Sequence, residues 1–224
     1  MPQPLPGDLI DIHTHDSIRA KGVFAVENLM LHEGKIPDDT ADAFSVGIHP
    51  WFINRDYRGN EIEWLAAIAT DKRIVAVGEA GYDMRRGPSV EIQRELFEIQ
   101  AELADSVSKP LIIHCVKGWD ELLASKRRIK PRMPWIIHGF NGSPEQAAQL
   151  TGGNFHLSMW VKSVLNGSLG RVLREVPTER IFLESDGFDE TMDTIYLKAA
   201  EAVGIDKSAL AETIRNNYLR LFVR

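Results

Sequence analysis

Eight short apolar runs rich in β-branched residues recur along the chain, and they constrain its fold more than any other feature. Most are followed by a stretch with the 3.6-residue period of an amphipathic helix, as in EIQRELFEIQAELA at residues 91–104. Buried strands that alternate with helices predict a parallel sheet joined by crossover helices. The predicted strands cover residues 8–15, 23–31, 43–49, 74–82, 110–116, 134–140, 154–160 and 181–186.

The predicted helices lie between and after these strands, at residues 61–70, 89–106, 119–125, 144–150, 162–175, 191–203 and 207–222. Eight strands alternating with helices predict an α/β fold of the (β/α)8 or TIM barrel type, for which about 250 residues is typical. The chain has only 224 residues, and seven separate the first two predicted strands. We therefore expect shortened early crossovers. No linker or internal repeat is visible, so we expect residues 1–224 to form a single domain.

Composition narrows the class of protein. Hydrophobic residues make up 44% and charged residues 26%, as in soluble globular proteins. No apolar stretch approaches the roughly 20 residues that span a bilayer, and the N-terminus has no signal-peptide pattern, so we expect a cytoplasmic protein that does not bind membranes. Cys115 is the single cysteine, so any metal must be held by His, Asp and Glu. The net charge of −6 argues against tight nonspecific binding to nucleic acid.

Ionisable side chains stand at or near the ends of six predicted strands. In a barrel these carboxyl-terminal ends converge on one mouth, where the active sites of this fold lie. His13 and His15 are two residues apart on one strand, so their side chains share a face and can bind one ion together. The full set is His13, His15, His49, Glu79, His114, His138 and Asp186.

Four of the histidines, His13, His15, His114 and His138, form a ligand set with the two carboxylates. Imidazole and carboxylate ligands suit zinc, manganese, nickel or iron. A lone histidine after an apolar run is more often a hydrogen-bonded core residue than a ligand. Burying six such groups together without partners, however, would cost roughly 2–7 kcal/mol each. Their joint occurrence therefore predicts a metal site.

The chain resembles the TatD family of metal-dependent deoxyribonucleases, within the amidohydrolase-like barrels. The resemblance spans nearly the whole chain, and six motifs occur in register. The motifs are DIHTH, VGIHPW, VGEAGYD, LIIHC, IIHGFNGS and LESDG, supported by QRELFEIQAELA and NNYLRLF.

This resemblance implies a site for two divalent ions (Zn, Mn, Mg, Ni or Fe) that activate a water for phosphodiester hydrolysis. His13, His15 and Asp186 would hold one ion, His114 and His138 the other, and Glu79 would bridge both. The implied catalytic residues are Asp186, Glu79 and His49, and the implied substrate-binding residues are Lys117 and His49. The expected function is that of a monomeric, exonuclease-like deoxyribonuclease acting on DNA ends or short single strands.

Two departures from the family pattern leave the substrate open. Val116 and Lys117 stand where many relatives carry an arginine, and the loop after the last strand reads GFDETMD, with acidic residues at 189, 190 and 193. An acidic loop at the mouth would repel a nucleic-acid backbone. A hydrolase of a small phosphoester, ester, lactone or amide on the same scaffold stays an alternative, as does a non-catalytic metal-binding scaffold protein.

Other basic and aromatic residues have two interpretations each. The basic run SKRRIKPR at 125–132 could bind phosphate, but its place between a helix and the next strand favours a solvated loop at the opposite end of the barrel. The tryptophans Trp51, Trp119 and Trp160 could stack bases, although packing at the rim is the commoner role. Cations that follow strands, and so edge the mouth, are Lys21, Arg85, Arg86, Lys117 and Lys162.

Overall fold

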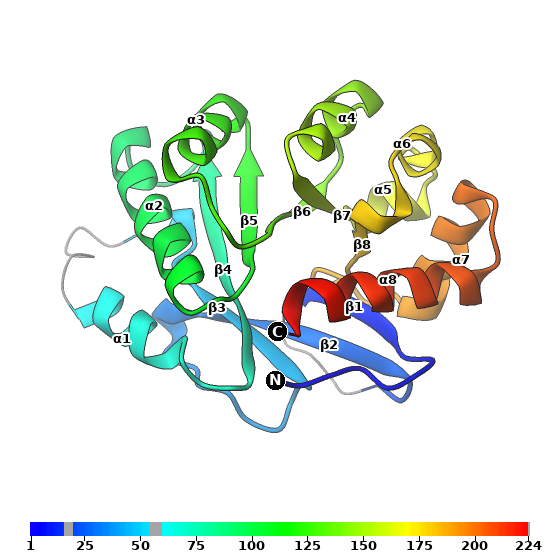
Figure 1. Cartoon of the computed structure of the whole chain (residues 1–224), viewed down its shortest axis with the longest axis horizontal. Helices are drawn as coiled ribbons and strands as arrows, with labels where there is room; N and C mark the ends of the chain where they lie inside the picture. Colours follow the sequence, from blue (N-terminus) through cyan, green and yellow to red (C-terminus); the bar gives the residue numbers. More distant parts are fainter. Residues whose placement is uncertain (16–19, 54–59, 224) are drawn as a thin grey trace.

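Eight parallel strands follow one another around a single sheet in the order of the sequence (Figure 1). The computed structural model describes residues 1–15, 20–53 and 60–223. The strands are β1 (Leu9–Thr14), β2 (Val23–Met30), β3 (Ala43–Gly47), β4 (Ile74–Asp83), β5 (Leu111–Val116), β6 (Trp135–Phe140), β7 (Phe155–Met159) and β8 (Ile181–Leu183). Each predicted strand is confirmed, within a few residues at its ends.

The sheet curls until its last strand meets its first. The backbone N–H of Asp186 donates to the carbonyl of His13 at 3.1 Å, and the N–H of Ser185 donates to Oδ1 of Asp11 at 3.0 Å. β8 ends at Leu183, three residues earlier than predicted, and Asp186 has a φ of +50° that is incompatible with an extended strand. The sheet is thus a nearly closed (β/α)8 barrel, as predicted.

The helices are α1 (Asn60–Ile68), α2 (Val90–Ser106), α3 (Trp119–Ile129), α4 (Pro144–Gly152), α5 (Val161–Leu165), α6 (Gly170–Glu175), α7 (Met192–Val203) and α8 (Lys207–Phe222). Between β1 and β3 the described residues form no α-helix, only the 3₁₀ helix η1 (Leu31–Glu33). The prediction of shortened early crossovers is therefore confirmed. Two further 3₁₀ helices are η2 (Pro50–Phe52) and η3 (Thr178–Arg180).

The prediction of one continuous helix over residues 162–175 is wrong. The segment forms two short helices, α5 and α6, separated by a turn in which Gly167 has a φ of +76°. Apolar residues continue with a helical spacing across the turn, and both pieces bury them against the barrel, at Val164 and at Val172 and Leu173. The helical spacing of the apolar residues therefore continues through a segment in which the helix itself is interrupted.

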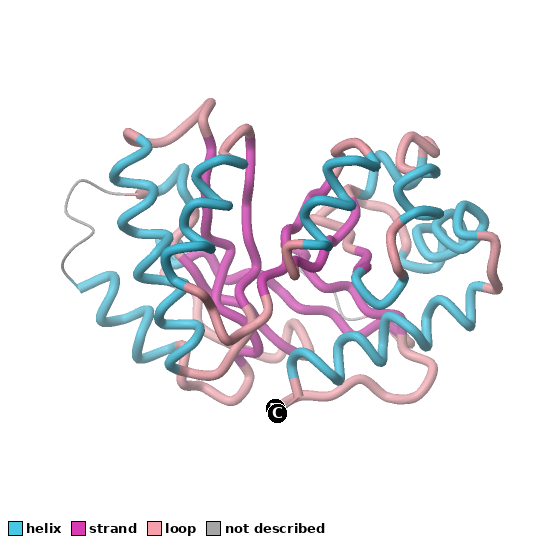
Figure 2. The backbone as a smooth tube through the Cα atoms, turned by 45° about the horizontal axis from the view of Figure 1, so that its top comes forward, coloured by secondary structure: helices cyan, strands magenta, loops and turns pink. Residues whose placement is uncertain are grey.

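The helices cover the outside of the strands (Figure 2). The helix α2 shows the reason in its sequence: Leu96, Phe97, Ala101 and Ala104 recur at helical spacing, and all four are buried. Within residues 1–15, 20–53 and 60–223, no helix combines the length and apolar character needed to cross a bilayer.

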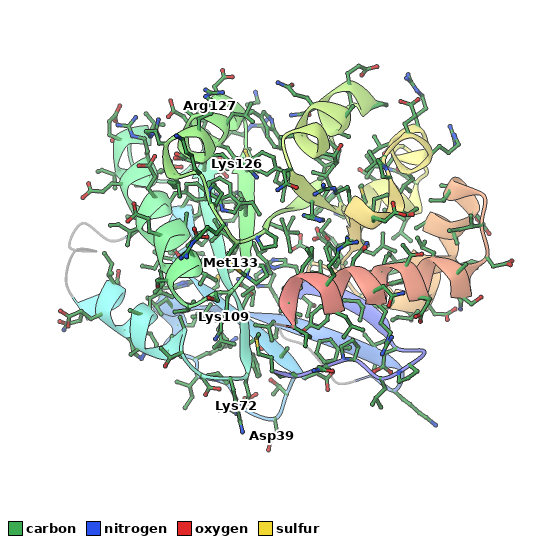
Figure 3. All side chains as sticks on the ribbon, viewed as in Figure 1. Asp39, Lys72, Lys109, Lys126, Arg127 and Met133 are labelled. Atoms are coloured by element: carbon green, nitrogen blue, oxygen red, sulfur yellow. The ribbon has the colours of Figure 1, made fainter. Side chains whose placement is uncertain are left out.

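The basic run at residues 125–132 lies away from the mouth. Its first part extends α3 to Ile129, four residues beyond the predicted end. Lys126 donates to the carbonyl of Asn154, which directly precedes β7, so this side chain lies at the amino-terminal end of the barrel. Figure 3 shows Lys126 and Arg127 on α3, on the face of the molecule turned toward the viewer. The position of Lys126, far from the mouth, does not favour the interpretation of this run as a phosphate-binding site.

Candidate metal centre

The six predicted ligands all lie at the carboxyl-terminal end of the barrel. Five strands supply them: β1 carries His13 and is followed by His15, β4 carries Glu79, β5 carries His114, β6 carries His138, and Asp186 follows β8. Glu79 reaches the centre because β4 packs tightly against β5. A Cβ atom at Gly81 would come within 1.9 Å of the carbonyl oxygen of His114, so only glycine permits this approach.

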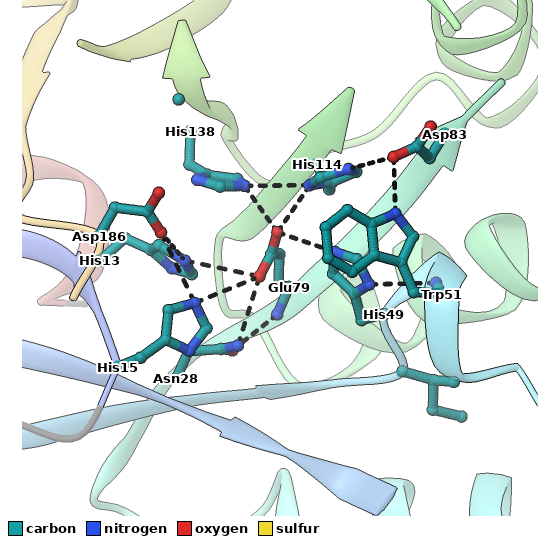
Figure 4. A network of polar contacts seen from close by, with 12 residues as sticks. His13, His15, Asn28, His49, Trp51, Glu79, Asp83, His114, His138 and Asp186 are labelled. Atoms are coloured by element: carbon teal, nitrogen blue, oxygen red, sulfur yellow. Dashed lines mark hydrogen bonds and ion pairs between the residues drawn. The ribbon is translucent and has the colours of Figure 1, made fainter. Parts of the chain in front are cut away.

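The carboxylate of Glu79 is the centre of the cluster (Figure 4). Its Oε1 lies 2.7 Å from Nε2 of His138, 2.8 Å from Nδ1 of His114 and 3.2 Å from Nε2 of His49. Its Oε2 lies 3.5 Å from Nε2 of His13 and 3.9 Å from Nε2 of His15. The two oxygens of one buried carboxylate thus face two different groups of imidazoles.

Asp186 completes the group on the Oε2 side. Its Oδ1 lies 3.6 Å from Nε2 of His15 and 3.7 Å from Nε2 of His13. The side chains of Asp186 and His15 are 15% and 27% exposed, whereas Glu79 is 3% exposed. Asp186 and His15 therefore border the open mouth, while Glu79 lies beneath them.

The cluster has the chemistry of a metal site. Three sets of side chains each bring their potential ligand atoms within 4.8 Å of one another: His13, Glu79 and His138; His13, His15 and Asp186; His49, Glu79 and His114. Both ring nitrogens of His13 are buried without a hydrogen-bond partner, which is costly unless something else binds them. Imidazole and carboxylate donors in these numbers fit a divalent transition metal.

Glu79 and His138 stabilise each other's charged forms. Burial favours the neutral acid at Glu79, but the charge of His138 and a hydrogen bond from His114 outweigh it, and hold the pKa of Glu79 well below its usual range. Burial likewise favours neutral His138, and the charge of Glu79 outweighs it, so that the pKa of His138 is raised. An anionic carboxylate at the centre is the form that binds a cation.

The pKa values of His15 and Asp186, the two groups nearest the mouth, shift so that the neutral form of each is favoured. Burial, aided by the neighbouring His13, lowers the pKa of His15 to about 4. Burial also raises the pKa of Asp186 to about 6, against the attraction of His138. Neutral His15 keeps a lone pair free, which a metal ligand requires.

Asn28 is a functional residue that the sequence analysis missed. Its Oδ1 accepts a hydrogen bond from the backbone N–H of Glu79 at 2.9 Å, and its Nδ2 lies 3.5 Å from Oε2 of the same residue. Ser45 in turn donates to Oδ1 of Asn28 at 3.1 Å. These contacts position Glu79. A polar residue inside the apolar run of β2 was the only signal available.

Asp83 is the second missed residue. Its Oδ2 lies 3.3 Å from Nε2 of His114 and accepts a hydrogen bond from Nε1 of Trp51 at 2.6 Å. Its Oδ1 accepts from the backbone N–H groups of Arg85 and Arg86 at 2.7 and 3.2 Å. Asp83 therefore connects a predicted ligand with the loop that follows β4. Asp83 is the last residue of the motif VGEAGYD, and its place in this motif was the signal in the sequence.

The two predicted substrate-binding residues lie in different surroundings. His49 is buried and belongs to the cluster itself, since its Nε2 contacts Glu79 and its Nδ1 accepts from the backbone N–H of Trp51 at 3.1 Å. Lys117 is exposed just after β5, with a φ of +58°. The role of each stays a prediction.

Residues 38–223 match the family model described as TatD related DNase. The chain belongs to the TatD family. The matched range contains Glu79, His114, His138 and Asp186, and it begins after His13 and His15, whose place in the cluster rests on the geometry above. The resemblance drawn from the motifs is therefore confirmed.

Named relatives in the TatD family include exonucleases. The chain is 30% identical over 147 residues to a protein of Pantoea ananatis (strain LMG 20103) named 3'-5' ssDNA/RNA exonuclease TatD; the match covers 63% of this chain and 56% of that one. It is 29% identical over 146 residues to an uncharacterized metal-dependent hydrolase of Bacillus subtilis (strain 168), YabD, with coverages of 63% and 57%. The chain thus spans a little over half the length of these curated relatives.

Solved structures of TatD proteins share the fold along almost the whole chain. The TatD homolog YJJV of Escherichia coli K12 superposes with a TM-score of 0.78 at 20% identity, and the match covers 97% of this chain and 99% of that one. A TatD family hydrolase of Entamoeba histolytica gives a TM-score of 0.78 at 14% identity, with coverages of 98% and 99%. At identities this low, the structural similarity shows only that the barrel fold is shared.

Proposed function

We propose that this TatD family member is a metal-dependent phosphodiesterase that removes nucleotides from the ends of single-stranded nucleic acid. The observation that carries the proposal is the position of Glu79, whose two carboxylate oxygens face separate groups of imidazoles. The name of the Pantoea ananatis relative, an exonuclease of single-stranded DNA and RNA, supports the substrate class. We place this activity in the cytoplasm, in a monomer of one domain.

In this proposal two divalent ions, of zinc, manganese, magnesium, nickel or iron, share the cluster. His13, His15 and Asp186 would hold one of them, His114 and His138 would hold the other, and Glu79 would bridge both. When bound, such a pair lowers the pKa of a water and neutralises charge on a phosphoryl oxygen.

The protein's own side chains supply orientation and proton transfer. Asp186 borders the mouth, so it is placed to orient the attacking water and to accept its proton. Glu79 lies beneath and carries the charge that holds the cluster together. His49 contacts Glu79 from the opposite side to Asp186, and with Lys117 it binds the substrate in this proposal.

One observation supports a second candidate, the hydrolysis of a small phosphoester, ester, lactone or amide. A cavity of about 880 Å³ has His15 among its lining residues, with both acidic side chains (Asp189, Glu190) and basic ones (Lys21, Lys207, Arg215) on its wall. A cavity of this volume fits a small molecule.

The proposed function is tested by incubating the protein with Mn²⁺, Mg²⁺ or Zn²⁺ and a single-stranded oligonucleotide labelled at its 5' or 3' end. We expect nucleotides to be released stepwise from one end. The Glu79→Ala variant should release none, while Glu102→Ala, which removes an exposed carboxylate on α2, should match the wild type. Wild-type protein that cleaves chromogenic esters but no oligonucleotide would establish the second candidate instead.

The two-ion arrangement is tested separately by elemental analysis of purified protein. We expect about two metal equivalents in the wild type and a loss of about one in each of His13→Ala and His114→Ala. Loss of both metals from either single variant would indicate one shared site in place of two.

A further inference from the structure

Two large aromatic side chains are exposed beside the cluster. Trp51 and Phe52 of η2 are 38% and 37% exposed. The Trp51 ring centroid lies 4.9 Å from that of His49 and 5.8 Å from that of His114. Exposed aromatic surface is unfavourable in water, so rings that border a catalytic cluster in this way indicate a binding surface.

Trp51 is fixed in its exposed position. Its Nε1 donates to Asp83 and its backbone N–H donates to Nδ1 of His49. Pro50 begins η2 and restricts the backbone before the ring. A ring held at both its side chain and its backbone loses little entropy when a ligand stacks on it.

Two exposed arginines lie beside this ring. The guanidinium carbon of Arg86 is 3.9 Å from the Trp51 ring centroid, and Arg85 is exposed next to it. Asp83 fixes the backbone of both arginines, as described above. Among the residues that the structure describes, no carboxylate pairs with either guanidinium, in contrast to the paired Arg128 and Arg171.

Acidic residues lie on the opposite side of the mouth. Figure 4 shows Trp51 and Asp83 on one side of Glu79, with Asp186 and His15 on the other. Asp189 and Glu190 lie three and four residues after Asp186, and they line the same cavity as His15. The exposed Arg85 and Arg86 can attract a phosphate chain to the side of Trp51.

We propose that Trp51, Phe52 and Arg86 form a subsite for the nucleobase next to the scissile phosphodiester. This inference rests on the proposed nuclease function and deepens it. Base–aromatic stacking contributes about 1–3 kcal/mol per base and accepts every base, because each has a π-face. A base held in a duplex has both faces covered by its neighbours, so this subsite selects unpaired strands. A base on Trp51 displaces the guanidinium of Arg86, which then contacts a phosphate.

The test compares two substrates that differ only in their bases. One is a short single-stranded oligothymidylate, and the other has the same backbone with abasic tetrahydrofuran units at its terminal positions. Both kcat/KM and, in EDTA to prevent turnover, the dissociation constant are measured. The proteins are the wild type, Trp51→Leu, Phe52→Leu, and Leu197→Ala as a control for loss of exposed apolar surface on α7.

We expect the wild type to prefer the thymidylate strand by about tenfold or more in both measurements. Trp51→Leu and Phe52→Leu should reduce this preference several-fold, and Leu197→Ala should retain it. A preference equal to that of the wild type in both aromatic variants would overturn the inference. The binding measurement needs no hydrolysis, so it decides the subsite even where the wild type cleaves neither strand, a result that would reject the nuclease function.

The Trp51→Phe variant separates stacking from a purely structural role. It keeps a ring but lacks the Nε1 donor to Asp83. If stacking is the role of Trp51, Trp51→Phe retains most of the preference for bases that Trp51→Leu loses. If Trp51 acts only through Asp83 and His114, Trp51→Phe and Trp51→Leu both lower kcat for the two strands alike and both keep the wild-type preference, which would overturn the inference.

Discussion

Oδ2 of Asp83 lies 3.3 Å from Nε2 of His114, while Nδ1 of the same ring lies 2.8 Å from Glu79. The imidazole is therefore held between two carboxylates. A carboxylate on the far nitrogen of a ligating histidine fixes the tautomer and makes the near nitrogen a stronger ligand. Asp83 thus holds the orientation of the His114 ring.

The Asp83→Asn variant should bind metal about 10–100-fold more weakly than the wild type, because the far nitrogen loses its anionic partner. Titration of metal-free protein monitored by calorimetry measures this affinity. Asp39→Asn, which removes an exposed carboxylate before β3, provides the control and should bind as the wild type does. Equal affinities in Asp83→Asn and the wild type would show that His114 needs no such partner.

The positions of the predicted ligands followed from the sequence because two simple rules combine in a barrel. Apolar runs identified the strands, and parallel topology brings the carboxyl-terminal ends of all strands to one mouth. A residue such as His138 could therefore be placed beside Glu79 although 58 residues lie between them, as their numbers show. No knowledge of side-chain contacts was required.

Residues that support the ligands could not be found in this way. Asn28 and Asp83 lie within strands, and their partners depend on the register between neighbouring strands, which is irregular on both sides of β4. The break between α5 and α6 was missed for a related reason. The apolar spacing records which side chains face the barrel, and it continues across a turn that only Gly167 signals.

Ser185 connects the short last strand to the first. Its Oγ donates to Oδ2 of Asp11 at 2.6 Å and lies 2.8 Å from Oγ1 of Thr14. The Ser185→Ala variant should lower the free energy of unfolding by about 1–3 kcal/mol, because it leaves the buried Asp11 short of a hydrogen bond. Urea unfolding followed by tryptophan fluorescence measures the change. The matched control is Ser168→Ala, an exposed serine between α5 and α6, for which a change below about 0.5 kcal/mol is expected. Equal stabilities of the two variants would refute the role of Ser185.

His156 makes the stability of the protein depend on pH. Its Nδ1 has no hydrogen-bond partner, and burial, followed by the nearby charge of Arg180, lowers its pKa to about 3 from 6.5 in the unfolded chain. Between these two values the unfolded chain binds a proton that the folded protein does not. The free energy of unfolding therefore falls as the pH falls below 6.5, by up to about 1.4 kcal/mol per pH unit. Above 6.5 this penalty is absent.

The His156→Gln variant lacks this titration and should lose less stability on acidification. The measurement is the free energy of unfolding of both proteins near neutral pH and at about pH 5. The difference between the two proteins isolates His156, because every other titrating group is common to both. Parallel pH profiles would show that His156 is protonated as readily in the folded state as in the unfolded chain.

Asp189 places a negative charge near the mouth. It is exposed, it lines the same cavity as His15, and it lies three residues after Asp186. The Asp189→Asn variant removes one repulsive charge at nearly constant shape, so kcat/KM for a single-stranded oligonucleotide should rise about two- to threefold at low salt. Near 1 M salt the Debye length falls to about 3 Å and the gain should disappear. Asp39→Asn, with the same charge change before β3, should show no gain at any salt concentration. A gain that persists at high salt would mean that Asp189 restricts the substrate by its shape and hydrogen bonding. An unchanged rate at low salt would mean that the oligonucleotide does not pass close to Asp189.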